Sequence, residues 1–158
     1  MKDIIKRLRT TYFIMVIPIF LLIFTIFALH KYEILIAYNS KYIGYIGLFL
    51  FVLSAFFGIA LPILMRNLFR YRAIKKGDMN ISLFFKFENK TLLIALISGY
   101  IANIAYILLV PKLHLYGSII IALYAIYVNY PEKKKIIVDL KTFGMDIENI
   151  QGINNEHK

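Results

Sequence analysis

Residues 91–130 read TLLIALISGYIANIAYILLVPKLHLYGSIIIALYAIYVNY, and Lys112 and His114 are their only ionisable side chains apart from tyrosines. This stretch decides the fold. A helix of about 20 residues, rising about 1.5 Å per residue, crosses a hydrocarbon core of roughly 30 Å. The stretch is long enough for two such helices, and Val110-Pro111-Lys112-Leu113 is suited to a tight turn between them. We therefore expect two transmembrane helices, residues 91–110 and 113–130.

Two further uncharged stretches, residues 11–29 and 43–65, precede this pair. The first is too long for the apolar core of a signal peptide, and no small-residue cleavage site follows it, so we expect it to be retained. Pro18 inside it predicts a local loss of backbone hydrogen bonding. Hydrophobic residues make up 60% of the 158. The sequence therefore predicts an all-α protein, a membrane four-helix bundle with short amphipathic cytoplasmic segments.

The basic residues lie almost entirely on one side of the four predicted spans. Residues 1–10, the connection 66–90 and the tail 131–158 carry four, seven and five Lys and Arg, whereas the two opposite connections carry three. The side richer in Lys and Arg remains in the cytoplasm. We expect a basic cytoplasmic N-terminus (1–10), a transmembrane domain (11–130) with a cytoplasmic loop at 66–90, and a cytoplasmic tail (131–158).

Three cytoplasmic segments have a pattern of their own. Cations alternate with apolar residues after Arg66, so we expect the second helix to continue until Gly77-Asp78 breaks it. Residues 81–87, ISLFFKF, are expected to form a separate interfacial segment whose aromatic side chains reach toward acyl chains. In the tail, the run of β-branched residues at 136–138 is typical of a short strand.

The net charge of +10 is explained most simply by orientation and by attraction to anionic lipid headgroups, at roughly 1 kcal/mol per basic residue near the surface. We expect the bilayer as a partner, and no nucleic acid. A membrane-protein partner or a second copy of the chain is also compatible with the pattern. The candidate headgroup ligands are Arg66, Arg70, Arg72, Lys75 and Lys76.

Small residues recur at helical spacing in three of the spans. They let helix backbones approach closely in lipid, where the hydrophobic effect does not hold helices together. Packing within one bundle and a face between identical chains are both consistent with such stripes. The stripes are Gly47, Ser54 and Gly58, then Ala95, Gly99 and Ala102, and finally Ser118, Ala122 and Ala125.

Asn103 lies near the middle of the third span, where an unsatisfied amide is costly. One interpretation is a hydrogen bond between helices, worth about 1 kcal/mol or less. The other places Asn103 beside a polar path with Thr25, Ser54, Ser98 and Tyr106.

Several chemistries are excluded by absent residues. The chain has no cysteine, which excludes disulfides, thiolate metal sites and cysteine nucleophiles. No Asp, Glu, Lys or Arg lies inside a predicted span. Small multidrug-resistance transporters, which share this size, need a glutamate there. His30 and His114 have only Glu33 as a carboxylate on their side, which makes a poor metal site. We expect no catalytic, cofactor-binding or metal-binding residue.

The end of the fourth span, Tyr127-Val128-Asn129-Tyr130-Pro131-Glu132-Lys133-Lys134, and the preceding Pro-Lys-Leu-His turn resemble small four-span bacterial inner-membrane proteins without an assigned function. The resemblance covers about the second half of the chain. It implies a multi-pass protein of a bacterial inner (plasma) membrane, and it carries over no activity.

Three functions are compatible with these patterns. Apolar spans with packing stripes and no functional polar cluster favour a non-catalytic accessory or scaffold subunit. The alternative is a small transporter or channel, with Pro18, Pro62 and Asn103 near its pathway. An enzyme would have to hold a phosphate with the basic connection, where only Asp78 and Glu88 could supply acid–base chemistry, so we expect no enzyme.

Overall fold

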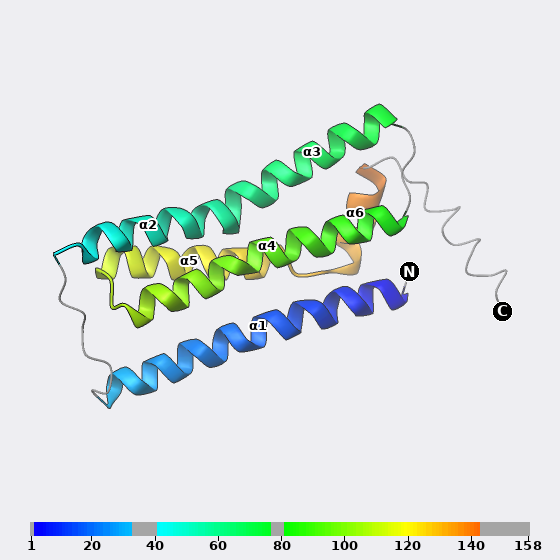
Figure 1. Ribbon diagram of the computed structural model, residues 1–158. Coiled ribbons are helices and arrows are strands. Elements are labelled where there is room, and N and C mark those ends of the chain that lie inside the picture. Colours follow the sequence, from blue (N-terminus) through cyan, green and yellow to red (C-terminus); the bar gives the residue numbers. More distant parts are fainter. Residues whose placement is uncertain (1, 33–40, 77–80, 143–158) are drawn as a thin grey trace.

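A computed structural model describes residues 2–32, 41–76 and 81–142, and every regular element in these ranges is a helix. The predicted all-α class is confirmed for this part of the chain (Figure 1). The short apolar stretch 34–38, the break at Gly77-Asp78 and the tail after residue 142 lie outside the described residues. The elements are α1 (Lys2–Lys31), α2 (Ile43–Ala55), the π-helix η1 (Phe56–Ala60), α3 (Leu61–Lys76), α4 (Ile81–Ile107), α5 (Lys112–Val128) and α6 (Lys133–Thr142).

Helices able to cross a membrane are present in the described part. Three stretches are long and apolar enough on their own: Ile5–Lys31, Ile43–Arg72 and Ile81–Ile107. α5 has 17 residues, about 26 Å of helix at 1.5 Å per residue, and α6 follows it after a bend of 79°. The described residues therefore hold three candidate spans, or four when the bent pair α5–α6 is counted as one.

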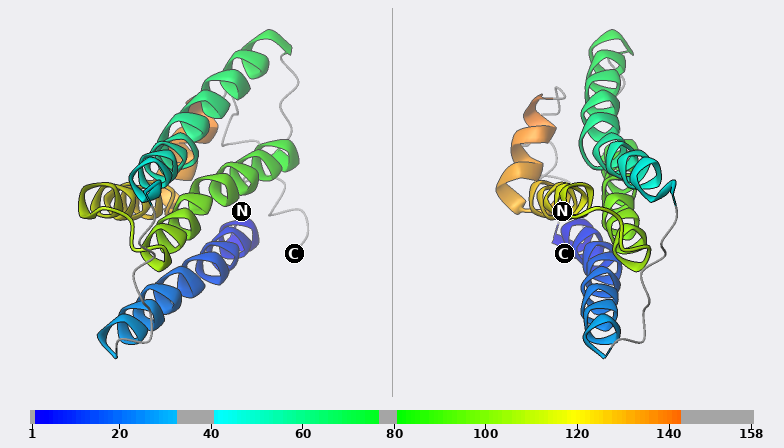
Figure 2. Two further views of the ribbon diagram at one scale, coloured as in Figure 1. Left: turned by 60° about the vertical axis from the view of Figure 1, so that its left-hand side comes forward. Right: turned by 90° about the vertical axis from the view of Figure 1, so that its left-hand side faces the viewer.

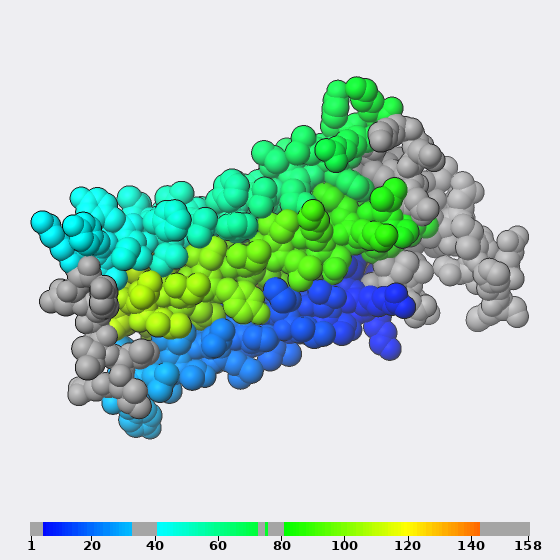
Figure 3. Space-filling view, in the orientation of Figure 1, coloured from blue at the N-terminus to red at the C-terminus, as the bar shows by residue number. Residues whose placement is uncertain are grey.

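α4 is the central helix. Its apolar window is 56% buried, against 22% for the corresponding windows of α1 and of the α2–α3 rod. α1 packs along one side of α4 and the α2–α3 rod along the other, while α5 covers α4 and α2 from one face, as the two views of Figure 2 show. On the face seen in Figure 3, the side chains of α1, α4 and α2–α3 close over one another.

The outward faces of α1 and α2 are broadly apolar. On α1, Ile14, Leu21 and Phe24 are each more than 60% exposed, and Phe49 of α2 is 63% exposed. A soluble protein rarely exposes continuous apolar surface of this kind. These faces suit contact with lipid chains or with another membrane helix.

Glycine allows two close helix approaches. A Cβ added at Gly99 would lie 2.6 Å from Cδ1 of Ile19, which occupies the space over this residue of α4. A Cβ at Gly58 would lie 2.9 Å from Cγ2 of Ile121 and 3.1 Å from Cβ of Ser98. α1 therefore approaches α4 over Gly99, and η1 approaches both α4 and α5 over Gly58.

The π-helix η1 lies in the middle of the second candidate span, just before Pro62. Proline has no N–H, and its ring crowds the carbonyl of the residue four positions earlier, here Gly58. The Leu61 N–H donates to the Phe56 carbonyl, five residues back. This wider turn accommodates the proline while the rod remains helical from Ile43 to Lys76.

The start of α1, the end of α3, the start of α4 and all of α6 meet at one end of the molecule, here called the basic end (Figure 1). Phe69, Ile81 and Phe85 pack around a small core at this end. The core consists of Ile5, Leu8, Phe84, Ile136 and Leu140.

Two sequence predictions are wrong at this end. Residues 136–138 belong to the helix α6, because Ile136 and Leu140, four positions apart, are both 1% exposed against the small core. Residues 81–87 are not a separate interfacial segment but the first turns of α4, and Phe84 is fully buried in protein. In both places tertiary packing overrides the local pattern.

Candidate functional site

The four uncharged stretches of the sequence all begin or end at the basic end. Arg9 precedes the first, Arg66 follows the second, Glu88 precedes the third and Lys135 follows the fourth. Arg66 reaches Glu88, Arg9 reaches the Pro131 carbonyl, and Lys135 reaches the Val128 carbonyl. The boundary of the second uncharged stretch is thus joined to that of the third, and the boundary of the first is joined to that of the fourth.

Arg66 is the centre of a cluster of four charges. Its Nη2 donates a hydrogen bond of 2.8 Å to Oε1 of Glu88, and its Nη1 lies 3.6 Å from Oδ2 of Asp139. The second distance is too long for a hydrogen bond, and Oδ2 of Asp139 is buried with no hydrogen bond to any described residue. Because the residues come from α3, α4 and α6, the cluster ties three helices together.

Lys135 is the fourth member of the cluster. Its Nζ donates to the Val128 carbonyl in the last turn of α5, where a cation is favoured by the orphan carbonyls and the helix dipole. Burial lowers the pKa of the Lys135 ammonium and Arg66 lowers it further, while Glu88 and Asp139 oppose them. Lys135 therefore joins the start of α6 to the end of α5.

The connection from α5 to α6 and the end of α5 are held by contacts with α1 and by a hydrogen bond back to α5. The Arg9 Nε donates to the Pro131 carbonyl at 3.3 Å, and its guanidinium carbon lies 5.8 Å from the centroid of the Tyr130 ring, within cation–π range. The Asn129 Nδ2 donates to the Ala125 carbonyl at 2.9 Å. The Tyr12 hydroxyl donates to the Ile126 carbonyl at 3.0 Å.

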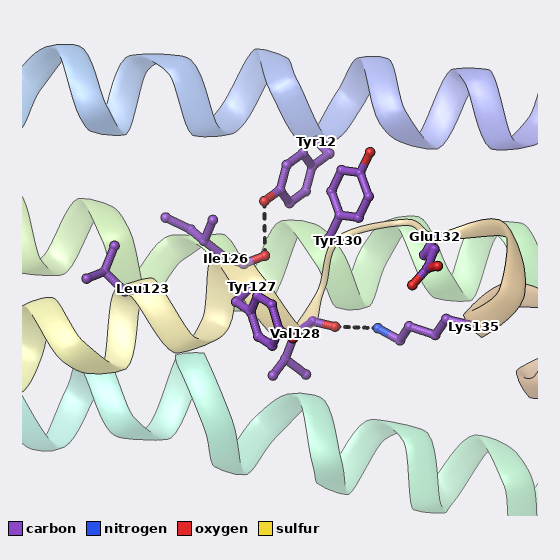
Figure 4. Close-up of a pocket in the computed structure, with 8 residues that line it drawn as sticks. All are labelled: Tyr12, Leu123, Ile126, Tyr127, Val128, Tyr130, Glu132 and Lys135. Carbon is purple, nitrogen blue, oxygen red and sulfur yellow. Dashed lines mark hydrogen bonds between the residues drawn. The ribbon is translucent and has the colours of Figure 1, made fainter.

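Between α1 and this connection lies an open pocket of about 580 Å³, here called the α5–α6 pocket (Figure 4). Side chains with polar atoms, Glu132 and Lys135, lie at the α6 side, and aliphatic side chains from α5 lie at the other. The lining residues are Tyr12, Leu123, Ile126, Tyr127, Val128, Tyr130, Glu132 and Lys135.

The five predicted headgroup ligands do not share one environment. Arg66 is engaged by Glu88 within the charge cluster. Arg70, Arg72 and Lys75 are exposed on α3, and the Lys75 Nζ lies 6.0 Å from the centroid of the Tyr71 ring. The Lys76 side chain lies outside the described residues.

The nine small residues and Asn103 are all buried within a single chain. The Asn103 Nδ2 donates to the Ile19 carbonyl at 3.2 Å, and one turn earlier the Tyr100 hydroxyl donates to the Met15 carbonyl. Both acceptors are in α1, beside Pro18. Asn103 is 2% exposed, and its Oδ1 has no hydrogen-bond partner in the part of the chain that the structure describes. The structure thus places Asn103 in the packed contact between α1 and α4.

Two residues of the proposed polar path, Thr25 and Ser98, donate their hydroxyl hydrogens to carbonyls of their own helices. Thr25 is exposed and donates to the Leu21 carbonyl of its own helix. Ser98 is buried and donates to the Ala95 carbonyl. Ser54 is also buried, and its Oγ has no hydrogen-bond partner among the described residues.

The arrangement of Arg66, Glu88, Asp139 and Lys135 can bind and hold charges. No three His, Asp or Glu side chains in the described ranges are arranged to hold a metal ion. Comparison of the chain with known protein families, with characterised proteins and with solved structures finds no match.

Sequence reasoning missed both the charge cluster and the α5–α6 pocket. One signal was available: Lys135 and Asp139 are four residues apart, as are Ile136 and Leu140. In a helix these pairs form adjacent polar and apolar stripes. No comparable signal places Tyr12 beside Ile126, because the two residues are 114 positions apart.

Proposed function

We propose that this chain is an integral membrane protein that crosses a bacterial inner membrane four times, with both ends in the cytoplasm. At the basic end, the boundaries of the four uncharged stretches are joined to one another. This arrangement supports the topology, because the polar residues that flank every span must start at the same depth, that of the membrane surface. α5 supplies the fourth span, and the bend of 79° before α6 lets α6 lie across the bundle end. The excess of Lys and Arg on this side supports its cytoplasmic position.

Within the membrane we propose a non-catalytic accessory or scaffold role. The observation that supports it most is the contrast between interior and surface. Inside, Asn103 and Ser98 donate to backbone carbonyls in closely packed contacts. Outside, α1 and α2 present large apolar side chains. In this proposal the protein acts through the apolar outer faces of α1 and α2, which contact another membrane protein in the bilayer.

Photo-crosslinking in native membranes tests this role. A photoreactive residue at Leu21, which is 61% exposed on α1, is expected to crosslink to one defined protein. The same residue at Leu96, which is fully buried in α4, is the control and is expected to give only crosslinks within the chain. Crosslinks to lipid alone from Leu21 and from Phe49, together with isolation of this chain alone in mild detergent, would overturn the proposal.

A small transporter or channel remains the second candidate, and one observation favours it. Ser54 Oγ, which has no hydrogen-bond partner among the described residues, lies two residues before η1, and π-bulges in helices are frequent at functional sites. Liposomes containing the purified chain would show solute flux that Ser54→Ala reduces. Equal flux in the two proteins, or none across a broad solute panel, would eliminate this candidate.

A further inference from the structure

The α5–α6 pocket lies where two predicted spans end. The first uncharged stretch begins beside Tyr12, and the fourth ends at Tyr130. One side of the pocket is therefore at the depth of lipid headgroups and the other at the depth of acyl chains, if the proposed topology holds. The pocket has matching chemistry: carboxylate and ammonium groups on the α6 side, and Leu123, Ile126 and Val128 on the α5 side.

We propose that this pocket binds a single phospholipid whose headgroup carries both a phosphate and a primary ammonium. Lys135 and the nearby Arg9 offer positive charge for the phosphate, and Glu132 offers negative charge for the ammonium. The acyl chains follow the aliphatic side of the pocket onto the outer face of α5. This inference rests on the proposed membrane topology.

The lining favours a zwitterionic headgroup over an anionic one. A purely anionic headgroup brings no cation of its own to the Glu132 carboxylate, and like charges at short range repel. Glu132 is exposed at the pocket, so its charge is available to a ligand. The lining holds both a carboxylate and an ammonium group, so it offers a partner to each of the two charges of a zwitterionic headgroup.

The lining also favours a lipid over a free water-soluble phosphate. Tyr127 is 82% exposed and Leu123 is 46% exposed, so the pocket continues onto apolar surface. A small soluble phosphate would leave that surface uncovered, whereas acyl chains would cover it. In the proposed topology this apolar surface lies among acyl chains, which a lipid supplies and a free headgroup does not.

The test measures lipid binding to the full-length chain in detergent by native mass spectrometry. The probes are short-chain phosphatidylethanolamine, short-chain phosphatidylglycerol and free phosphoethanolamine. We expect the phosphatidylethanolamine to bind about tenfold more tightly than either of the others, as one well-placed charge contact can supply. Glu132→Gln is expected to remove the preference over phosphatidylglycerol. Equal binding of the two lipids to the original chain, or an unchanged preference in Glu132→Gln, overturns the proposal.

A second pair of variants tests the location. Leu123→Trp places a large ring at the pocket and is expected to weaken phosphatidylethanolamine binding by about tenfold. Ile120→Trp is the control, because Ile120 is exposed on the same helix and does not line the pocket. Equal loss in both variants would place the lipid elsewhere, and tight binding of phosphoethanolamine alone would show a soluble ligand. If lipid binding fails while the orientation of the chain holds, only this inference is lost.

Discussion

Gly58 is a residue at which a single carbon atom decides how closely two helices approach. Its added Cβ would meet Ser98 Cβ, which has no freedom to rotate away, at 3.1 Å. Gly44 in the same rod has nothing within 4 Å of the added atom. Alanine substitutions at these two positions therefore distinguish the effect of the close contact at Gly58 from the effect of helix propensity, which both positions share.

We predict that Gly58→Ala destabilises the protein by about 1–3 kcal/mol, because overpacking forces neighbouring helices apart. Gly44→Ala, the matched control, is expected to be neutral or to stabilise by up to about 1 kcal/mol, since alanine favours a helix. Unfolding in mixed micelles with increasing SDS, followed by circular dichroism, measures both. Equal effects of the two substitutions would contradict the close approach at Gly58.

Asn103 makes one hydrogen bond and leaves its Oδ1 unpaired. Interhelical polar contacts in membranes contribute about 0.6 kcal/mol on average, whereas a buried unpaired acceptor costs about 1–3 kcal/mol. We therefore predict that Asn103→Leu does not destabilise the protein and stabilises it by up to about 2 kcal/mol, because the relieved cost exceeds the lost contribution. The same SDS titration measures the change. A loss of several kcal/mol would show that the amide has partners beyond Ile19.

At the scale of elements, α6 is held by two kinds of contact. Ile136 and Leu140 enter the small core, and Asp139 and Lys135 enter the charge cluster around Arg66. When one partner of a buried ion pair is removed, the remaining charge is left uncompensated. The Arg66 side chain is 26% exposed, so solvent reduces the cost of leaving its partners uncompensated.

We predict that Arg66→Met destabilises the docking of α6 by about 1–3 kcal/mol, because Glu88 and Asp139 are then left with Lys135 alone. Hydrogen exchange of the amides in residues 133–142 is expected to become faster, with little change in α5. Arg70→Met, an exposed position on the same helix, is the control and should change stability by less than about 0.5 kcal/mol. Protection of α6 that survives Arg66→Met would show that the apolar core alone holds it.

Some features of the helices could be predicted from the sequence, and others could not. The uncharged stretches lie in long helices, because charge must leave the hydrocarbon core whatever the tertiary structure. The helical state of residues 136–138 could not be predicted from Ile-Ile-Val, whose local preference is for a strand. It follows from contacts with Ile5, Leu8 and Phe84. The α5–α6 pocket could not be predicted from the sequence either. The contact between Arg9 and Pro131 fixes the connection from α5 to α6, and these residues are 122 positions apart.

At the scale of the whole molecule, the proposed orientation rests on which end carries the cations. The chain has no native cysteine, so one introduced cysteine is the only thiol. Lys134 on α6 and Lys112 at the start of α5 are both exposed and lie at opposite ends of the molecule. The two positions can therefore report the two membrane faces.

We predict that a membrane-impermeant maleimide labels Lys112→Cys in intact spheroplasts, and that it labels Lys134→Cys only after the membrane is opened. The reason is the excess of Lys and Arg at the basic end. The reverse result would invert the orientation. Labelling of both positions in intact spheroplasts would show that the chain does not cross the bilayer between them.

The docking of α6 also sets an order of events during synthesis. Lys135 and Asp139 leave the ribosome after the helices that carry Arg66 and Glu88, so those helices wait for their last charged partners. In a chain that stalls before residue 135, Ile5, Leu8 and Phe84 would stay uncovered. The Glu88 carboxylate would have Arg66 as a partner but would still lack Lys135. Exposed apolar surface of this kind marks an unfinished protein for chaperones and proteases, and the synthesis and docking of α6 would remove that mark.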